Sequence, residues 1–116
     1  MKCVPPSYFA DPNVLHWVAE DDGRLVGEVL CHYLRLPSGP GRELLLYSIG
    51  VRERYRRQGV GRALMKTVLA WAREADIPEI WLVADNPGAE EFYVACGYVR
   101  GGPNEQGVLM LRTTAG

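Results

Sequence analysis

The sequence predicts an α/β (α+β) fold in which helices pack on a mixed β-sheet, with the element order β-β-β-α-β-α-β-β. Three observations support this prediction. The chain has 116 residues, the usual size of one domain, so we expect a single domain over residues 1–116. Apolar runs with a strand pattern come first, and a long stretch of helical period follows them. A further strand, a second helix and two short strands complete the chain, and strands joined through a helix are typically parallel neighbours in one sheet.

The composition is that of an ordinary globular chain, with 47% hydrophobic and 23% charged residues. Thirteen basic residues are offset by fourteen acidic ones, so we expect no nucleic-acid partner. No apolar run approaches the roughly 18 residues of a membrane span, and the first residues lack the apolar segment of a signal peptide. Cys3, Cys31 and Cys96 are widely spaced and form neither a metal pattern nor an even disulfide set. We therefore expect reduced thiols, no metal, no membrane partner and a cytoplasmic location.

The first half of the chain predicts an arm and three strands. Residues 1–13 contain three prolines and no clear period, which predicts an irregular arm with at most one helical turn. An acidic cluster ending in glycine separates residues 15–19 from residues 25–34, which predicts a hairpin. Residues 37–41 are rich in proline and glycine and should form a loop. Residues 43–51 form a near-continuous apolar run, which suits a strand buried on both faces.

A long amphipathic helix is predicted over residues 58–75, where apolar side chains recur at steps of three and four. Residues 79–84 then read as a strand, which should lie parallel to strand 43–51 because the long helix joins them.

A second helix is predicted after Asn86, which can cap the first free amides, while Pro87 suits the first helical position. Gly97 should end this helix as a left-handed cap. Two short strands near residues 98–100 and 108–112, with a Gly/Pro loop between them, complete the sheet.

The turn from strand 43–51 into the long helix carries the strongest chemical signal. Gly59 and Gly61 open the helix, and glycines let a ligand approach the backbone closely. The first helical turn has unpaired amides and a partial positive charge, so it is suited to bind an anion. Five arginines surround the turn: Arg52, Arg54, Arg56, Arg57 and Arg62. The pattern is neither a Walker loop nor a dinucleotide fingerprint. It fits a pyrophosphate site, and it also fits an ordinary strand-to-helix turn with solvated arginines.

Two motifs carry a resemblance to a known family. Arg56-x-x-Gly59-x-Gly61, after a buried strand and before a helix, resembles the acetyl-CoA motif of the GNAT superfamily of N-acetyltransferases. Residues 86–98 resemble the family's second signature, Asn-x-x-Ala-x-x-Phe-Tyr-x-x-x-Gly-Phe/Tyr. The resemblance covers about residues 14–112, in the family's order of strands and helices. Short segments at residues 9–12, 18–20 and 47–51 are most similar to the branch that contains the aminoglycoside 3-N-acetyltransferases.

The resemblance implies an enzyme that transfers an acetyl group from acetyl-CoA to a primary amine of a small molecule by direct attack, without a metal. Backbone groups of Ile49 and Val51 would pair with the pantetheine arm. Asn86 would contact the pantetheine or orient the thioester, and Tyr93 would protonate the departing thiolate as a general acid. The implied cofactor-binding residues of the turn are Arg56, Arg57, Gln58, Gly59, Val60, Gly61 and Arg62.

Simpler interpretations exist for both catalytic candidates. Tyr93 belongs to a helical stripe of the kind that usually forms core, together with Ala89, Phe92 and Cys96. Asn86 could serve only as a helix cap. The general base is open, because Ser48 stands where related proteins often have an acid. Four side chains are candidates for the base: Asp85, Glu28, His32 and Glu43.

The resemblance implies that residue 14 onward corresponds to the family's second strand, and we expect residues 1–13 to be too short for the family's usual N-terminal strand-helix unit. The edge of strand 15–19 would then be unpaired, which favours a homodimer unless residues 1–13 fold back over that edge. Three other functions compete with the small-molecule enzyme. The first is a non-catalytic acyl-CoA-binding or regulatory module. The second is a nucleic-acid binder that uses Arg52–Arg62, and the third is an acetyltransferase of peptide N-termini or one associated with nucleic acid.

Overall fold

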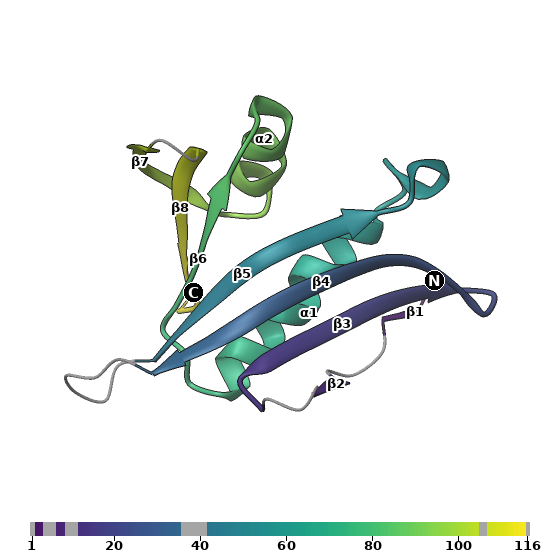
Figure 1. Ribbon diagram of the computed structural model, residues 1–116, viewed down its shortest axis with the longest axis horizontal. Helices are drawn as coiled ribbons and strands as arrows, with labels where there is room; N and C mark the ends of the chain where they lie inside the picture. The colour runs from purple at the N-terminus through teal and green to yellow at the C-terminus, as the bar shows by residue number, and fades with distance from the viewer. Residues whose placement is uncertain (1, 4–6, 9–11, 36–41, 105–106, 116) are drawn as a thin grey trace.

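The computed structural model describes residues 2–3, 7–8, 12–35, 42–104 and 107–115. It forms one sheet with the strand order β1-β3-β4-β5-β6-β8-β7, in which β2 also pairs with β3 (Figure 1). All described pairings are antiparallel except β5 with β6. The elements are β1 (Lys2–Cys3), β2 (Ser7–Tyr8), β3 (Val14–Asp21), β4 (Arg24–Arg35), β5 (Arg42–Val51), α1 (Val60–Glu74), β6 (Glu79–Ala84), α2 (Pro87–Ala95), β7 (Val99–Asn104) and β8 (Gly107–Thr113). From residue 14 onward this is the predicted order.

The predicted stripe of α1 forms the centre of the core. Figure 1 shows α1 behind β3, β4 and β5. Leu64 and Val68 are fully buried there, together with Trp17 and Leu44 from the sheet. Trp17 also meets Trp71 of α1 edge to face, with ring centroids 5.8 Å apart. The helix therefore covers one face of this half of the sheet.

A bulge at Tyr47 changes which side chains of β5 face the helices. Leu46 pairs with Cys31 and Ser48 pairs with Leu30, so Tyr47 has no partner on β4. Leu44 and Leu46 are buried before the bulge, and Ile49 and Val51 pack against the core after it. The prediction that this strand is buried on both faces is wrong, because Tyr47 is 66% exposed and Ser48 is also exposed. The apolar run therefore continues on the face away from the core, where Leu45 is half-buried and Tyr47 is exposed.

The parallel pairing of β5 with β6 is confirmed, but it is short. Only residues 43–45 pair with residues 79–81. Beyond them the two strands diverge, and β6 runs with β8 and α2 away from β5 (Figure 1). The second half of β5 therefore has β4 on one edge and no described strand on the other.

The N-terminal arm is more ordered than predicted. Residues 2–3 pair with residues 19–20, and residues 7–8 pair with residues 15–16. The prediction of an irregular arm is therefore wrong for β1 and β2. The outer edge of β3 offers unpaired amides and carbonyls, and these two short strands satisfy part of it.

Two predicted loops have different outcomes. The loop predicted at residues 37–41 lies outside the described residues. The prediction of a Gly/Pro loop after Arg100 is wrong for residues 101–104, because β7 continues to Asn104. Arg100 pairs with Met110 and Gly102 pairs with Leu109, so Gly101 is the extra residue of a bulge, a position that glycine tolerates well.

Candidate active site

A cavity of about 1050 Å³ opens where β5 leaves β6, bounded by the first turns of α1 and α2. Its volume is at the upper end of small-molecule sites, which span roughly 300–1,000 Å³. The cavity brings together every predicted cofactor-binding residue except Gln58. Its lining residues are Ile49, Gly50, Val51, Tyr55, Arg56, Arg57, Gly59, Val60, Gly61, Arg62, Asp85, Asn86, Gly88, Ala89, Phe92 and Tyr93.

The first turn of α1 presents backbone amides to this cavity. Gly59 is the N-cap residue, with a left-handed φ of 85°, and no side chain caps the helix. The first hydrogen bond of this turn runs from the amide of Ala63 to the carbonyl of Gly59, at 3.0 Å. The amides of Val60, Gly61 and Arg62 therefore have no acceptor within the helix. This geometry can bind an anion such as a phosphate.

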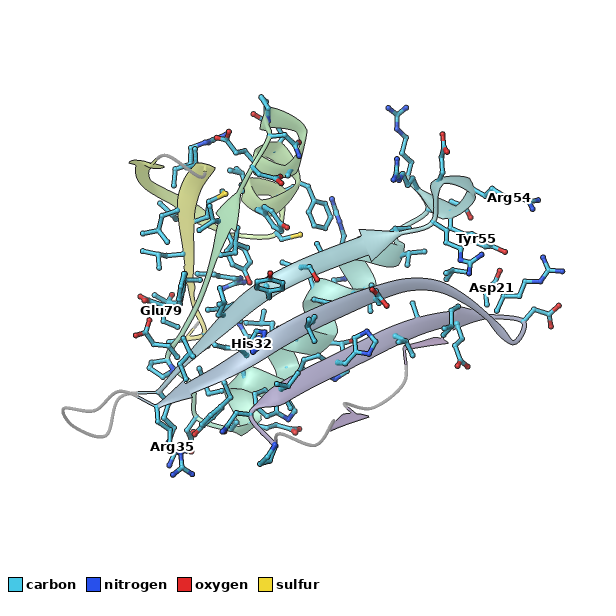
Figure 2. The ribbon with its side chains drawn as sticks, viewed as in Figure 1. Asp21, His32, Arg35, Arg54, Tyr55 and Glu79 are labelled. Carbon is cyan, nitrogen blue, oxygen red and sulfur yellow. The ribbon has the colours of Figure 1, made fainter. Side chains whose placement is uncertain are left out.

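The five arginines of the turn do not act as one cluster. Arg56, Arg57 and Arg62 line the cavity, whereas Arg52 and Arg54 do not. Figure 2 shows Arg54 and Tyr55 in the segment that follows β5. Gln58 donates from its side-chain amide to the carbonyl of Arg54 at 2.9 Å, so this side chain serves the loop.

Glycine is favoured at the two motif positions, Gly59 and Gly61, for different structural reasons. A Cβ atom at Gly61 would lie 3.1 Å from Cζ of Phe92, so glycine here lets α1 approach α2. A Cβ atom at Gly59 would meet nothing within 4 Å, and its positive φ is what favours glycine. Of these two positions, only Gly59 has open space where a side chain could stand.

Asn86 acts as the predicted N-cap of α2. Its Oδ1 accepts a hydrogen bond of 2.8 Å from the amide of Ala89. Its Nδ2 donates to Oδ1 of Asp85 at 3.0 Å. Both ends of the side chain therefore have partners within the chain, and a contact of Asn86 with the pantetheine stays a prediction.

The cap predicts a measurable stability effect. Asn86→Ala removes the acceptor for the Ala89 amide, so we expect the free energy of unfolding to fall by about 1 kcal/mol. Asn86→Ser keeps a capping oxygen and is expected to remain near the wild-type value. Urea unfolding followed by circular dichroism measures both. Equal losses in the two variants would show that the cap does not stabilise α2.

Tyr93 belongs to the core and also lines the cavity. It is 8% exposed, and its ring centroid lies 5.4 Å from that of Phe92 and 6.0 Å from that of Tyr98. Burial raises the pKa of the Tyr93 phenol, and the charge of Asp85 raises it further. The phenol is therefore protonated at neutral pH, as a proton donor must be.

The four candidate bases have very different positions. Only Asp85 lines the cavity. His32 lies toward the Arg35 end of β4 in Figure 2, and its ring meets that of Tyr47 edge to face at 5.5 Å. Glu43 pairs with Glu79 where β5 and β6 are joined, at the far end of β5 from the cavity. Glu28 does not line the cavity, but it pairs directly with Gly50, which does.

Sequence reasoning missed five lining residues: Gly50, Tyr55, Gly88, Ala89 and Phe92. Ala89 and Phe92 belong to the stripe that the sequence pattern predicts as core, and only the position of α1 against α2 shows that this stripe borders a cavity. A glycine inside an apolar strand can mark a close approach to the backbone, and this signal could have indicated Gly50. Tyr55 follows β5 within a short 3₁₀ turn, Glu53–Tyr55, which the sequence pattern does not show.

Within the part of the chain that the structure describes, no group of three His, Cys, Asp or Glu side chains is placed to hold a metal ion. Among the described helices, none has the length and apolar character needed to cross a membrane.

The fold and the motifs have clear relatives. Residues 2–98 match the family model described as Acetyltransferase (GNAT) family, and the chain belongs to this family. N-acetyltransferase 8 of Rattus norvegicus is 31% identical over 111 residues, which cover 94% of this chain and 50% of that protein. The chain therefore spans about half the length of this relative.

Two solved structures illustrate the shared fold. The PaiA N-acetyltransferase of Thermoplasma acidophilum in complex with coenzyme A has a TM-score of 0.78 at 16% identity, over 87% of this chain and 61% of that one. An aminoglycoside acetyltransferase from an uncultured soil metagenomic sample, in complex with sisomicin, has a TM-score of 0.71 at 21% identity, over 75% of this chain and 59% of that one. At these identities the likeness concerns the fold.

Proposed function

We propose that this chain transfers an acetyl group from acetyl-CoA to a primary amine of a small molecule. One observation carries the proposal: a single cavity gathers the amide-bearing start of α1, the part of the β5 edge that no described strand pairs with, and the phenol of Tyr93. The names of the relatives add support, because N-acetyltransferase 8 and the aminoglycoside acetyltransferase are both acetyltransferases.

The residues of the cavity fit acetyl-CoA. The amides of Val60, Gly61 and Arg62 would hold the pyrophosphate, helped by the positive charge of Arg56 and Arg57. Backbone groups of Ile49 and Val51 would pair with the pantetheine arm, because no described strand continues the sheet beyond this part of β5. When bound, acetyl-CoA supplies an acetyl group activated as a thioester.

Tyr93 would act as the general acid. Its phenol keeps its proton at neutral pH and can donate it to the sulfur atom as negative charge develops there. Asn86 would hold Asp85 and the start of α2 in place through its two hydrogen bonds, and would contact the pantetheine. A backbone amide of the β5 edge would stabilise the charge on the carbonyl oxygen.

The decisive experiment is a screen of amines for release of free CoA from acetyl-CoA, detected with a thiol reagent. The panel contains polyamines, aminoglycosides, amino acids and peptides with a free N-terminus. Release that depends on both the protein and one amine class supports the proposal. Binding of CoA by calorimetry without turnover on any amine would contradict it and favour a non-catalytic acyl-CoA-binding module.

A homodimer in the cytoplasm forms part of this proposal. The β3 edge gives less reason for a partner than the sequence predicts, because β1 and β2 already pair with part of it. Exposed Val83 and Val99 offer another apolar surface for association. We expect light scattering at micromolar concentration to give twice the monomer mass of 12.9 kDa. A constant monomer mass on concentration would contradict the dimer.

A further inference from the structure

A histidine–glutamate pair lies on the face of the sheet opposite to α1. Nε2 of His16 in β3 is 3.2 Å from Oε2 of Glu28 in β4. The neighbouring Gly27 faces α1, because a Cβ atom there would lie 2.9 Å from Cγ1 of Val60. Successive side chains alternate between the faces of a strand, so Glu28 points away from the helix. The pair is therefore on the face that α1 leaves uncovered.

The backbone of Glu28 lies beside the edge of the cavity, and its carboxylate is held at His16 on the neighbouring strand β3. Glu28 pairs with Gly50 across β4 and β5, and paired residues in antiparallel strands have Cα atoms roughly 4.5–5.5 Å apart. Gly50 lines the cavity, and a Cβ atom on it would meet nothing within 4 Å. The surface over Gly50 is therefore open beside Glu28. The Glu28 side chain is 60% exposed, so it is accessible to a molecule that arrives from solvent.

The other candidate bases are less well placed for an acceptor. Asp85 already accepts a hydrogen bond from Asn86, and it lies on the α2 side of the cavity together with Tyr93. Glu43 and His32 do not line the cavity. Their partners across β4 and β5, Leu34 and Leu45, do not line it either. Glu28 stands on β4 beside Gly50, on the other side of the cavity from α2 and Tyr93. The group that accepts a proton and the group that donates one would then act from different sides.

We propose that the surface over Gly50 is the acceptor side of the site, where Glu28, positioned by His16, binds the ammonium group of a cationic amine and takes a proton from it. This inference rests on the proposed acetyl transfer. A primary alkylamine has a pKa near that of lysine, about 10.4, so at neutral pH it arrives charged. It then needs a carboxylate to bind it and a group to accept its proton before the nitrogen can attack.

The bonds and protons balance. One N–H bond of the ammonium breaks, and its proton passes to the Glu28–His16 pair and then to water. The nitrogen lone pair forms the C–N bond to the acetyl carbon, and the π electrons of the C=O bond move to its oxygen. The C=O bond then re-forms as the C–S bond breaks. Tyr93 gives its proton to the sulfur, and a second proton lost by the nitrogen restores the phenol. The products are an amide, a thiol and one released proton.

The test uses 1,4-diaminobutane as the probe and Glu28→Gln as the variant, which keeps the shape and removes the charge. Amide NMR signals are followed during titration with the diamine, with and without saturating CoA. In the wild-type protein we expect shifts at Gly50 and His16. In Glu28→Gln we expect the dissociation constant to rise about tenfold or more, because a hydrogen bond to a charged group is lost. Glu79→Gln, at the far end of the sheet in Figure 2, removes a carboxylate elsewhere and should bind as wild type.

Kinetics complete the test. Glu28→Gln should lower kcat/KM for the diamine while KM for acetyl-CoA stays unchanged. His16→Gln should raise KM for the diamine and leave KM for acetyl-CoA unchanged, as expected for a positioning residue. Absence of diamine shifts at Gly50 in the wild type, or equal diamine affinity in Glu28→Gln, would overturn this inference. Shifts of the Val60–Arg62 amides with CoA report on the cofactor site separately, so failure of the proposed function can be distinguished.

Discussion

Tyr93→Phe is expected to lower turnover about tenfold to a thousandfold while CoA affinity stays at the wild-type value. The substitution keeps the ring that packs between Phe92 and Tyr98, and it removes only the hydroxyl group. Packing and proton donation are thereby separated. Turnover is measured by release of free CoA, and CoA affinity by calorimetry.

Tyr98→Phe is the matched control for this prediction. Tyr98 belongs to the same aromatic cluster and is 4% exposed, but it does not line the cavity. Loss of its hydroxyl group should leave turnover unchanged. If Tyr93→Phe keeps the wild-type turnover on a confirmed substrate, Tyr93 is a core residue and not the acid.

The pKa of Tyr93 also predicts the alkaline limit of the reaction. Burial and the charge of Asp85 raise this pKa above the ordinary value of 10.0. The phenol therefore stays protonated as the pH rises to 10. Any loss of turnover that comes from its ionisation lies above pH 10, and in Tyr93→Phe that loss disappears.

Local sequence signals predicted the elements well, because caps and periodicity act over a few residues. Asn86 caps α2 as predicted, and α1 buries Leu64 and Val68 from the predicted stripe. The bulge at Tyr47 could not be predicted in the same way. An apolar run on a strand does not show where an extra residue is inserted, because that position depends on the pairing with β4.

The sequence predicted most of the residues that line the cavity, but not on which side of the cavity each one lies. Four possible bases could be placed on strands or strand ends, yet their distance from the cavity depends on pairings between distant segments. Glu28 becomes informative only because it pairs with Gly50. Likewise, the sequence treats Gly59 and Gly61 as equivalent members of a motif. The contact of Gly61 with Phe92 requires the position of a second helix, which local patterns do not encode.

This difference between the glycines decides how the cofactor site should be tested. A carboxylate at position 61 would collide with Phe92, so lost binding there would not separate charge from shape. Gly59→Asp is the sharper variant, since the space above Gly59 is open and aspartate tolerates a left-handed φ better than most residues. Gly59→Asn is the matched control, because it has the same size, the same backbone demand and a similar capping ability.

We expect Gly59→Asp to abolish detectable binding of CoA, while Gly59→Asn still binds it. The new carboxylate would accept hydrogen bonds from the free amides of the first turn of α1. It would also repel the diphosphate that needs those amides. Two like charges about 4 Å apart near a protein surface repel by roughly 4 kcal/mol, on the order of a thousandfold in affinity. Calorimetry at low and high salt measures the effect, and salt should weaken the difference between the two variants because it screens charge. Equal CoA affinity in the aspartate and asparagine variants would mean that the pyrophosphate does not lie over the start of α1.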